Sequence, residues 1–261
     1  MSSIKSAAIL VAAGQGERLA GFTGGIPKQF IQLSQAPLFI WSLTTLAKHA
    51  LIEHVLVTVP DEWQRRAAEL VADFLPEFKN KIAIIAGGST RQQSVYLALE
   101  KLASSEKRPS YVFVHDAVRP FVTSYILDQI LKKLEEGNAV TLGIPLSDSI
   151  KEVNNNIVLE DLDRGKFILV QTPQAAKFNL LLEAHRTAKL QQKESTDDAS
   201  IIKAFGTTVT VVTGSKLNFK ITEPEDLLIA QALIEHHNWS VGHIYYNSSN
   251  NLSAFSIKMM E

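Results

Sequence analysis

Cysteine is missing from this sequence of 261 residues. Its absence excludes disulfide bonds, a thiolate nucleophile and cysteine-ligated metals, and it fits a reducing compartment. The seven histidines do not occur at HExxH or any comparable metal-ligand spacing. His236 and His237 end a predicted helix, where they complement the helix dipole. The sequence therefore predicts no metal site built on cysteine or histidine.

An excess of either charge is also missing, since 26 lysines and arginines face 27 aspartates and glutamates, for a formal net charge of −1. Such a balance gives no general attraction to nucleic acid or to an anionic membrane, so any anionic ligand must be held by a local cluster of cations. The apolar run 7–13 is too short to span a membrane and lacks the cleavage pattern of a signal peptide. We expect a soluble, cytoplasmic protein without nucleic-acid or membrane partners.

Short β-rich runs alternate with helical patterns along most of the chain. With 46% hydrophobic residues the chain can bury a substantial core. The alternation predicts an α/β fold, a three-layer, Rossmann-like, mostly parallel sheet with helices on both faces. The expected strands are 7–12, 54–59, 81–86, 111–115, 139–144 and 208–213.

The last helix has recognisable ends. Thr222 and Glu225 form a capping-box pattern that opens it, and it ends near His237. We expect the compact domain to end there as well, giving a domain over 1–239 and a C-terminal tail over 240–261. The tail mixes polar and apolar stretches without a clear period.

One stretch, about 147–170, breaks the alternation. It contains two extended segments, "SIKEV" and "IVLEDL", around an Asn154-Asn155-Asn156 turn. A hairpin inserted after the fifth strand would project from the sheet and need a partner to cover its apolar residues. We therefore predict a projecting β-arm that supports a homodimer.

The first strand runs into a long glycine-rich loop that fits neither standard phosphate-binding motif. Gly14 and Gly16 begin a dinucleotide fingerprint, but Leu19 stands where the third glycine belongs. A P-loop is excluded because no glycine precedes Lys28 and no serine or threonine follows it.

The same loop carries groups that can hold a polyphosphate. Gly14 and Gly16 expose backbone amides, and Arg18 and Lys28 flank a flexible segment, 21–25. Amides and cations together can surround a polyphosphate. The alternative is a mobile surface loop with solvated cations, and the loop alone does not decide between them.

Two further loops follow predicted strands. "GGSTRQQSV" places Gly87 and Gly88 before Arg91, which by itself is interpreted as an ordinary surface residue. "HDAVRPF" places Asp116 and Arg119 at the carboxyl edge of the sheet. Because ligands of open α/β sheets bind outside the carboxyl ends of the strands, the three loops are expected to converge on one site.

The roles of two charged residues in these loops stay open at this level. Asp116 can bind Mg²⁺, accept a hydrogen bond from a ribose or substrate hydroxyl, or cap a helix. Lys220, beside the last strand, can enter the same crevice or remain a solvated strand charge.

The motifs together resemble a known family. "LVAAGQGERL", "PKQF", "GGSTRQQSV", "HDAVRPF", "DLDRGKFILVQTPQ", "STDDAS" and "NFKITEPEDL", in this order over residues 4–238, are similar to the 2-C-methyl-D-erythritol 4-phosphate cytidylyltransferases of the non-mevalonate isoprenoid pathway. The resemblance implies that CTP and the sugar alcohol phosphate are joined, with release of pyrophosphate and a requirement for Mg²⁺. It also implies a homodimer in which the arm reaches the neighbouring subunit.

The resemblance further implies roles for particular residues. Arg18, Lys28 and Lys220 match the family's catalytic cations, and Asp116 would be the metal ligand. The nucleotide would be approached by Ala12, Ala13, Gly14, Gly88, Ser94 and Ala117. The alcohol phosphate would be held by Asp116, Arg119, Ser149, Arg164, Thr172 and Thr196.

The chain departs from the family pattern in two places. The opening loop, which carries Arg18, is longer than expected, and Ser89 stands where some relatives carry an acidic residue. The leading hypothesis is a cytidylyltransferase for methylerythritol phosphate. The alternatives are a cytidylyltransferase for a pentitol phosphate such as ribitol 5-phosphate, and a catalytically silent nucleotide-binding protein.

Overall fold

A seven-stranded sheet forms the centre of the protein. The computed structural model describes residues 6–14 and 24–244. The strands lie in the order β11-β7-β10-β6-β1-β4-β5, and only β10 runs antiparallel to its neighbours. Their bounds are β1 Ser6–Val11, β4 Ile52–Val59, β5 Ile82–Ala86, β6 Tyr111–Asp116, β7 Ala139–Pro145, β10 Ile168–Lys177 and β11 Thr210–Thr213.

The predicted strands are confirmed, but β10 was not predicted. Its first residues, Ile168–Val170, fall at the end of the stretch that was predicted to be the arm. It inserts between β6 and β7 and pairs antiparallel with both. The sheet is therefore mostly parallel, as predicted, with one antiparallel strand near its centre.

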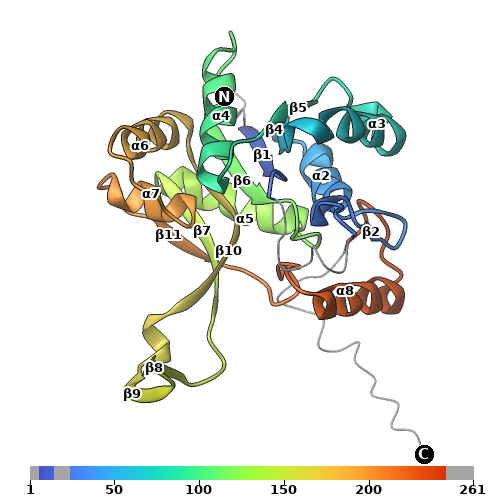
Figure 1. Ribbon diagram of the computed structural model, residues 1–261. Coiled ribbons are helices and arrows are strands. Elements are labelled where there is room, and N and C mark those ends of the chain that lie inside the picture. The colour runs from blue at the N-terminus through green and yellow to red at the C-terminus, as the bar shows by residue number, and fades with distance from the viewer. Residues whose placement is uncertain (1–5, 15–23, 245–261) are drawn as a thin grey trace, which may run out of the picture.

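Helices cover both faces of the sheet (Figure 1). Period-2 alternation sends Ala7 and Ile9 of β1 to one face and Ala8 and Leu10 to the other. The first face is covered by α4 Arg91–Ala103, α6 Phe178–Leu190 and α7 Asp198–Ala204. The second is covered by α2 Leu38–Lys48, α3 Gln64–Phe74, α5 Ser124–Glu136 and α8 Pro224–His237. The predicted three-layer arrangement is confirmed.

Short elements complete the described chain. They are the 3₁₀ turns η2 Lys28–Phe30, η3 Asp61–Trp63, η4 Pro76–Phe78 and η5 Arg164–Lys166, and the small ribbon of β2 Gln32–Leu33 and β3 Ala36–Pro37. None of the helices within the described residues is long and apolar enough to cross a membrane.

The predicted β-arm is a two-stranded hairpin that projects from the sheet after β7 (Figure 1). Strands β8 Ile150–Asn154 and β9 Ile157–Leu162 pair antiparallel. Asn155 and Asn156 form the connection with φ of 47° and 63°, in the left-handed region that asparagine tolerates better than most residues. The asparagine run therefore sets the turn, and Asn154 belongs to the strand.

Helix α8 begins one residue away from the predicted cap. Glu223, not Thr222, is the N-cap, and its capping box is closed by Asp226 rather than Glu225. The reason is that Pro224 takes the first helical position, which leaves the residue before it as the cap. The predicted end at His237 is confirmed.

Packing continues beyond α8 within the described residues. Trp239 and Ile244 are 4% and 8% exposed and belong to the same core cluster as the helix. The aromatic ring of Trp239 lies 5.3 Å from that of Phe121. The first part of the predicted tail thus contributes to the core, and residues 245–261 lie outside the described residues.

Gly87 allows the loops after β1 and β5 to approach each other closely. A Cβ atom built on Gly87 would lie 2.3 Å from Cβ of Ala13 and 3.0 Å from Oγ of Ser94. No side chain fits in that space without displacing one of these loops. The predicted need for a glycine at this place is therefore explained by contact with the neighbouring loop.

We expect Gly87→Ala to lower the free energy of unfolding by about 1–3 kcal/mol, the usual cost of forcing a methyl group into a packed region. Gly137→Ala is the matched control, because a Cβ there would meet nothing closer than 3.7 Å. Urea unfolding followed by circular dichroism measures both. Equal urea midpoints for the two variants would show that the loops can move apart without a loss of stability.

Candidate active site

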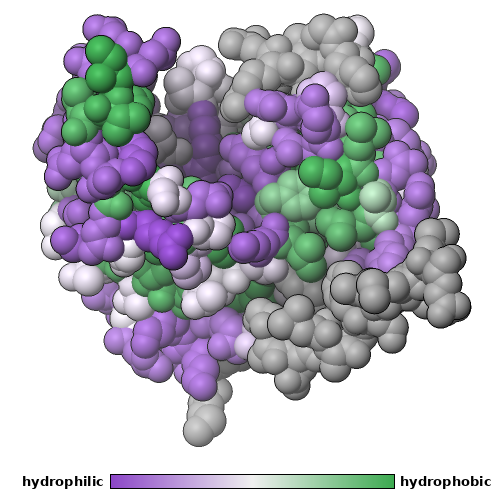
Figure 2. Space-filling view, turned by 90° about the horizontal axis from the view of Figure 1, so that it is seen from below, coloured by the Kyte–Doolittle hydropathy of each residue, from purple (hydrophilic) through white to green (hydrophobic). Residues whose placement is uncertain are grey.

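A cavity of about 510 Å³ opens at the carboxyl edge of the sheet. Figure 2 views the molecule from this side and shows a recess walled largely by hydrophilic residues. The cavity is lined by Val11, Ala12, Ala13, Gly14, Lys28, Gln29, Gly88, Ser89, Thr90, Arg91, Ser94, Asp116, Val118 and Lys220. The predicted convergence of the three loops is confirmed, whereas Arg18 lies outside the described residues.

Lys28 reaches the cavity from the short turn η2. Its neighbours hold the turn in place: Gln29 Nε2 donates to the carbonyl oxygen of Ala12 at 2.5 Å. The ring of Phe30 stacks on that of Trp63 with 4.5 Å between centroids. Lys28 is thus presented to the cavity from a turn that a buried amide and an aromatic anchor hold in place.

The amino end of α4 forms a second wall. Thr90 caps the helix by accepting a hydrogen bond from the backbone N–H of Gln93 at 3.1 Å. Ser94 Oγ accepts from the N–H of Gly88 at 3.0 Å and donates to the carbonyl of Thr90 at 2.9 Å. These bonds fix the loop 88–90 at the positive end of a helix dipole, where a ligand phosphate is favoured.

Asp116 lies at the centre of the charged groups. Its Oδ1 accepts from Arg91 Nε at 3.0 Å, and its Oδ2 accepts from Lys220 Nζ at 2.9 Å. Burial alone would raise the pKa of Asp116, but the charges of Arg91 and Lys220 outweigh it and hold that pKa below its ordinary value. Asp116 is therefore an ionised carboxylate with a cation on each oxygen.

These contacts decide two of the open alternatives. Asp116 is not a helix cap, because it ends β6 and the N-cap of α5 is Thr123. Lys220 is not a solvated strand charge, because it lines the cavity and pairs with Asp116.

Arg91 is not the ordinary surface residue that its sequence position suggested. It occupies the first position of α4 and bridges two carboxylates, Asp116 and Asp198, with Nη1 at 2.8 Å from Oδ2 of Asp198. Asp198 also accepts from His185 Nε2 at 2.9 Å. No sequence signal pointed to His185, and only the STDDAS motif marked Asp198.

Arg119 is directed away from the cavity lining. It is 9% exposed, and its Nη1 and Nη2 donate to the carbonyl oxygens of Asn218 and Val170 at 2.9 and 3.4 Å. Burial lowers its pKa from the ordinary value of an arginine. In this chain the guanidinium fastens β10 to the segment before α8. Arg119 does not line the cavity, although its backbone N–H donates to the carbonyl of Asp116 at 3.0 Å.

Three neighbours of Asp116 take part in the packing and hydrogen bonding of the protein interior. Thr172 Oγ1 accepts from the N–H of Asp116 at 3.1 Å and lies 3.0 Å from Nδ1 of His115. Burial lowers the pKa of His115 to about 4, so its ring is neutral near neutral pH and joins Thr172 to the carbonyl of Arg119. Ala117 is fully buried and donates its N–H to the carbonyl of Val11.

The remaining predicted residues are not brought to the cavity by a single chain. Ser149 and Arg164 are exposed on the arm, and Thr196 is exposed just before α7. Arg164, in η5, donates from Nη1 to the carbonyl of Ser147 within the arm.

Among the described lining residues, the cavity offers a magnesium ion no free carboxylate. Asp116 carries the only carboxylate among the described lining residues, and cations occupy both of its oxygens. Within residues 6–14 and 24–244, no cluster of acidic or histidine side chains could hold a metal ion. The donor set fits an anion rather than a cation.

Known proteins of one family match nearly the whole chain. The family sequence model described as IspD, 2-C-methyl-D-erythritol 4-phosphate cytidylyltransferase, matches residues 6–236. The protein of that name from Bacillus cereus (strain ATCC 10987 / NRS 248) is 36% identical over 226 residues, which cover 87% of this chain and 96% of that protein. The one from Carboxydothermus hydrogenoformans is 37% identical over 231 residues, 88% of this chain and 95% of that protein.

Solved structures agree. The 2-C-methyl-D-erythritol 4-phosphate cytidylyltransferase from Thermus thermophilus superposes with a TM-score of 0.70 at 31% identity, covering 87% of this chain and 98% of that one. The 4-diphosphocytidyl-2C-methyl-D-erythritol synthase from Anaerococcus prevotii DSM 20548 gives a TM-score of 0.75 at 23% identity, covering 89% of this chain and 97% of that one, a likeness of fold alone. The chain therefore belongs to the 2-C-methyl-D-erythritol 4-phosphate cytidylyltransferase family.

Proposed function

We propose that this protein transfers a cytidylyl group from CTP to 2-C-methyl-D-erythritol 4-phosphate, giving 4-diphosphocytidyl-2-C-methyl-D-erythritol and pyrophosphate in non-mevalonate isoprenoid biosynthesis. The observation that carries the proposal is the meeting of Lys28, Lys220 and the glycine-rich backbone of residues 12–14 and 88 in one cavity. Family membership supplies the substrates, and the cavity supplies an anion-binding wall that suits them.

The reaction needs charge stabilisation more than proton transfer. An oxygen of the alcohol phosphate attacks the α-phosphorus of CTP, a new P–O bond forms, and the bond to the β-phosphate breaks to release pyrophosphate. The attacking phosphate is already ionised near neutral pH, so no general base is required. Lys28 and Lys220 neutralise the negative charge that develops on the phosphate oxygens, and Arg18, from the loop outside the described residues, adds a third cation.

Magnesium is assigned to the nucleotide rather than to Asp116. The two oxygens of Asp116 already accept hydrogen bonds from Arg91 and Lys220, so its carboxylate is a poor metal ligand here. Mg²⁺ readily binds substrate phosphates while it keeps several waters. When bound, it would supply additional neutralisation of triphosphate charge.

A homodimer is proposed from the apolar surface of the arm and its base. Ile157, Val158 and Leu159 on β9 are 58–65% exposed, and the first residues of β10 are also exposed. An isolated two-stranded hairpin is at best marginally stable in water, so a second copy that covers these side chains would stabilise it. The partner's arm would bring Ser149 and Arg164 to the acceptor phosphate.

We place the protein in the cytoplasm, in keeping with its lack of cysteine.

The acceptor is tested by supplying CTP and Mg²⁺ with either methylerythritol phosphate or ribitol 5-phosphate and measuring pyrophosphate. We expect release with methylerythritol phosphate. Release with ribitol phosphate alone would establish the pentitol alternative. No release with either acceptor, in a sample that binds CTP, would favour a silent nucleotide-binding protein.

Lys28→Ala should lower kcat by on the order of a hundredfold or more, the scale for removing one transition-state donor. Lys132→Ala, an exposed lysine of α5, is the control and should leave kcat unchanged. Steady-state kinetics of both variants measures the difference. Near-normal turnover of Lys28→Ala would refute a catalytic role for this lysine.

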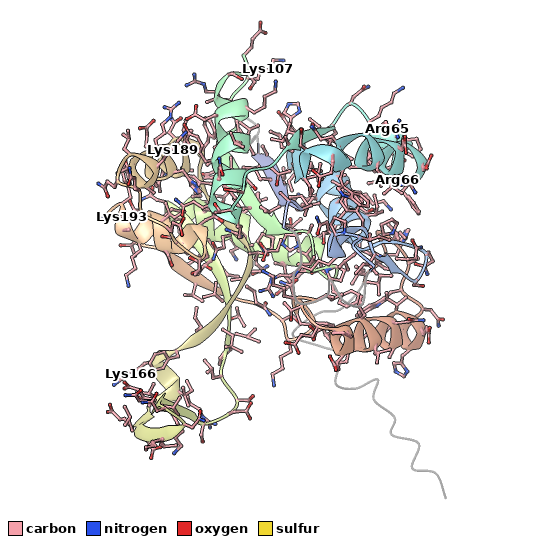
Figure 3. The ribbon with its side chains drawn as sticks, in the orientation of Figure 1. Arg65, Arg66, Lys107, Lys166, Lys189 and Lys193 are labelled. Carbon is pink, nitrogen blue, oxygen red and sulfur yellow. The ribbon has the colours of Figure 1, made fainter. Side chains whose placement is uncertain are left out.

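Arg164→Ala should raise KM for the alcohol phosphate by on the order of tenfold, since a hydrogen bond to a charged group is lost, and leave KM for CTP nearly unchanged. Lys166→Ala is the control. It changes a neighbouring cation on the same turn, and Figure 3 shows Lys166 on the arm, away from the sheet.

Heterodimers that carry one Arg164→Ala subunit and one Lys28→Ala subunit test whether sites are shared. Activity is measured at an alcohol phosphate concentration well below KM, where both variant homodimers are slow. If the arm serves the partner's site, one of the two sites has both residues intact and activity returns to about half that of the wild type. Isolated heterodimers without recovery would place each complete site within one chain.

A further inference from the structure

A network of charged and hydrogen-bonded side chains extends from the cavity to α7 and α6. Lys220 pairs with Asp116, Asp116 with Arg91, and Arg91 with Asp198, at 2.9, 3.0 and 2.8 Å. His185 of α6 ends the network, with its Nε2 at 2.9 Å from Oδ1 of Asp198. His185 and Asp198 are each 1% exposed. The network thus links the proposed catalytic lysine to two helices that contribute no residue to the described cavity lining.

The stability of the fold does not by itself explain this arrangement. Arg91 is the first residue of α4, where a positive charge opposes the helix dipole. Buried ion pairs contribute little net stability, because desolvation of the charges offsets their attraction. What the network does supply is a fixed geometry, because the guanidinium of Arg91 is held between two carboxylates.

The far end of the network is anchored independently of Arg91. Gln174 of β10 accepts hydrogen bonds through Oε1 from the backbone N–H groups of Asp198 and Ala199, at 2.8 and 3.0 Å. The side chain of Asp197 caps α7 by accepting from the N–H of Ser200 at 2.8 Å. Asp198 is therefore a rigid point against which a guanidinium can be oriented.

We propose that Arg91 and Asp198 are positioning residues for the transfer reaction. Asp198 orients the guanidinium of Arg91, Arg91 fixes Oδ1 of Asp116, and the fixed carboxylate holds Lys220 Nζ at the phosphate that is attacked. With Arg91 absent, Asp116 has one side-chain partner and is free to turn toward Lys220, which withdraws the lysine from the cavity. This inference rests on the proposed role of Lys220.

A double-mutant cycle tests whether Arg91 acts through Lys220. Arg91→Met should lower kcat by on the order of tenfold to a hundredfold, as expected for a misplaced reacting group. In a Lys220→Ala background the same change should have little further effect on kcat. If the kcat losses of the two single variants multiply in the double variant, Arg91 acts independently of Lys220, and the inference is overturned.

The matched control is Arg65→Met. The Arg65 side chain is 93% exposed on α3, and Figure 3 shows it on the outside of the molecule, far from the arm and α7. Its kcat should equal that of the wild type. If the wild-type chain releases no pyrophosphate, the proposed function fails. In that case the same four proteins are compared by their CTP dissociation constants. Non-additive losses of CTP binding free energy would support the inference, and additive losses would contradict it.

A second comparison separates positioning from a structural role. Arg91→Met and Asp198→Asn each remove one partner from a buried charge, so each should lower the urea midpoint, and the double variant should regain part of that loss. Turnover of the double variant should stay as low as that of Arg91→Met, because Asp116 still lacks its second donor. Recovery of turnover together with stability would show a merely structural role and would refute the inference.

Discussion

The pairing of one buried carboxylate, Asp116, sets the layout of the cavity. A buried carboxylate needs hydrogen-bond donors in place of water. Here the donors come from α4 and from the segment before α8. The backbone N–H of Asp116 in turn donates to a hydroxyl oxygen of β10. The donors Arg91 and Lys220 lie 25 and 104 positions away along the sequence. The requirement to neutralise one group therefore draws distant segments to the carboxyl end of β6.

Strand β10 joins this centre to the arm. Its first residues, Ile168–Val170, are exposed at the base of the arm, whereas those from Gln171 to Ala176 are buried in the sheet. Thr172, in the buried part, meets the backbone of Asp116. One continuous strand thus forms part of the proposed dimer surface and also holds the backbone of Asp116, so a partner bound at the arm would contact an element that supports the charged centre.

Lys28 and Lys220, the two proposed catalytic cations among the described residues, are held by different interactions. Lys28 is followed by Gln29 and Phe30, which fix its turn through a hydrogen bond to the loop after the first strand and through aromatic packing. Lys220 is fixed by an ion pair whose carboxylate is itself held by Arg91. A site with one cation on a packed turn and another on a charge network can bring both to one polyphosphate, because each is oriented before the ligand arrives.

The sequence by itself determined the alternation of strands and helices, the asparagine turn of the arm, and the meeting of three loops at one sheet edge. These features follow from short-range periodicity, from turn chemistry and from the rule that parallel strands end together. Only the tertiary structure decided that β10 runs antiparallel near the centre, that Arg119 faces backbone carbonyls, and that Arg91 bridges Asp116 and Asp198. Arg91 and Asp198 are 107 positions apart, and no local pattern records such a pair, because the contact exists only once burial has brought α4 and α7 to the same face of the sheet.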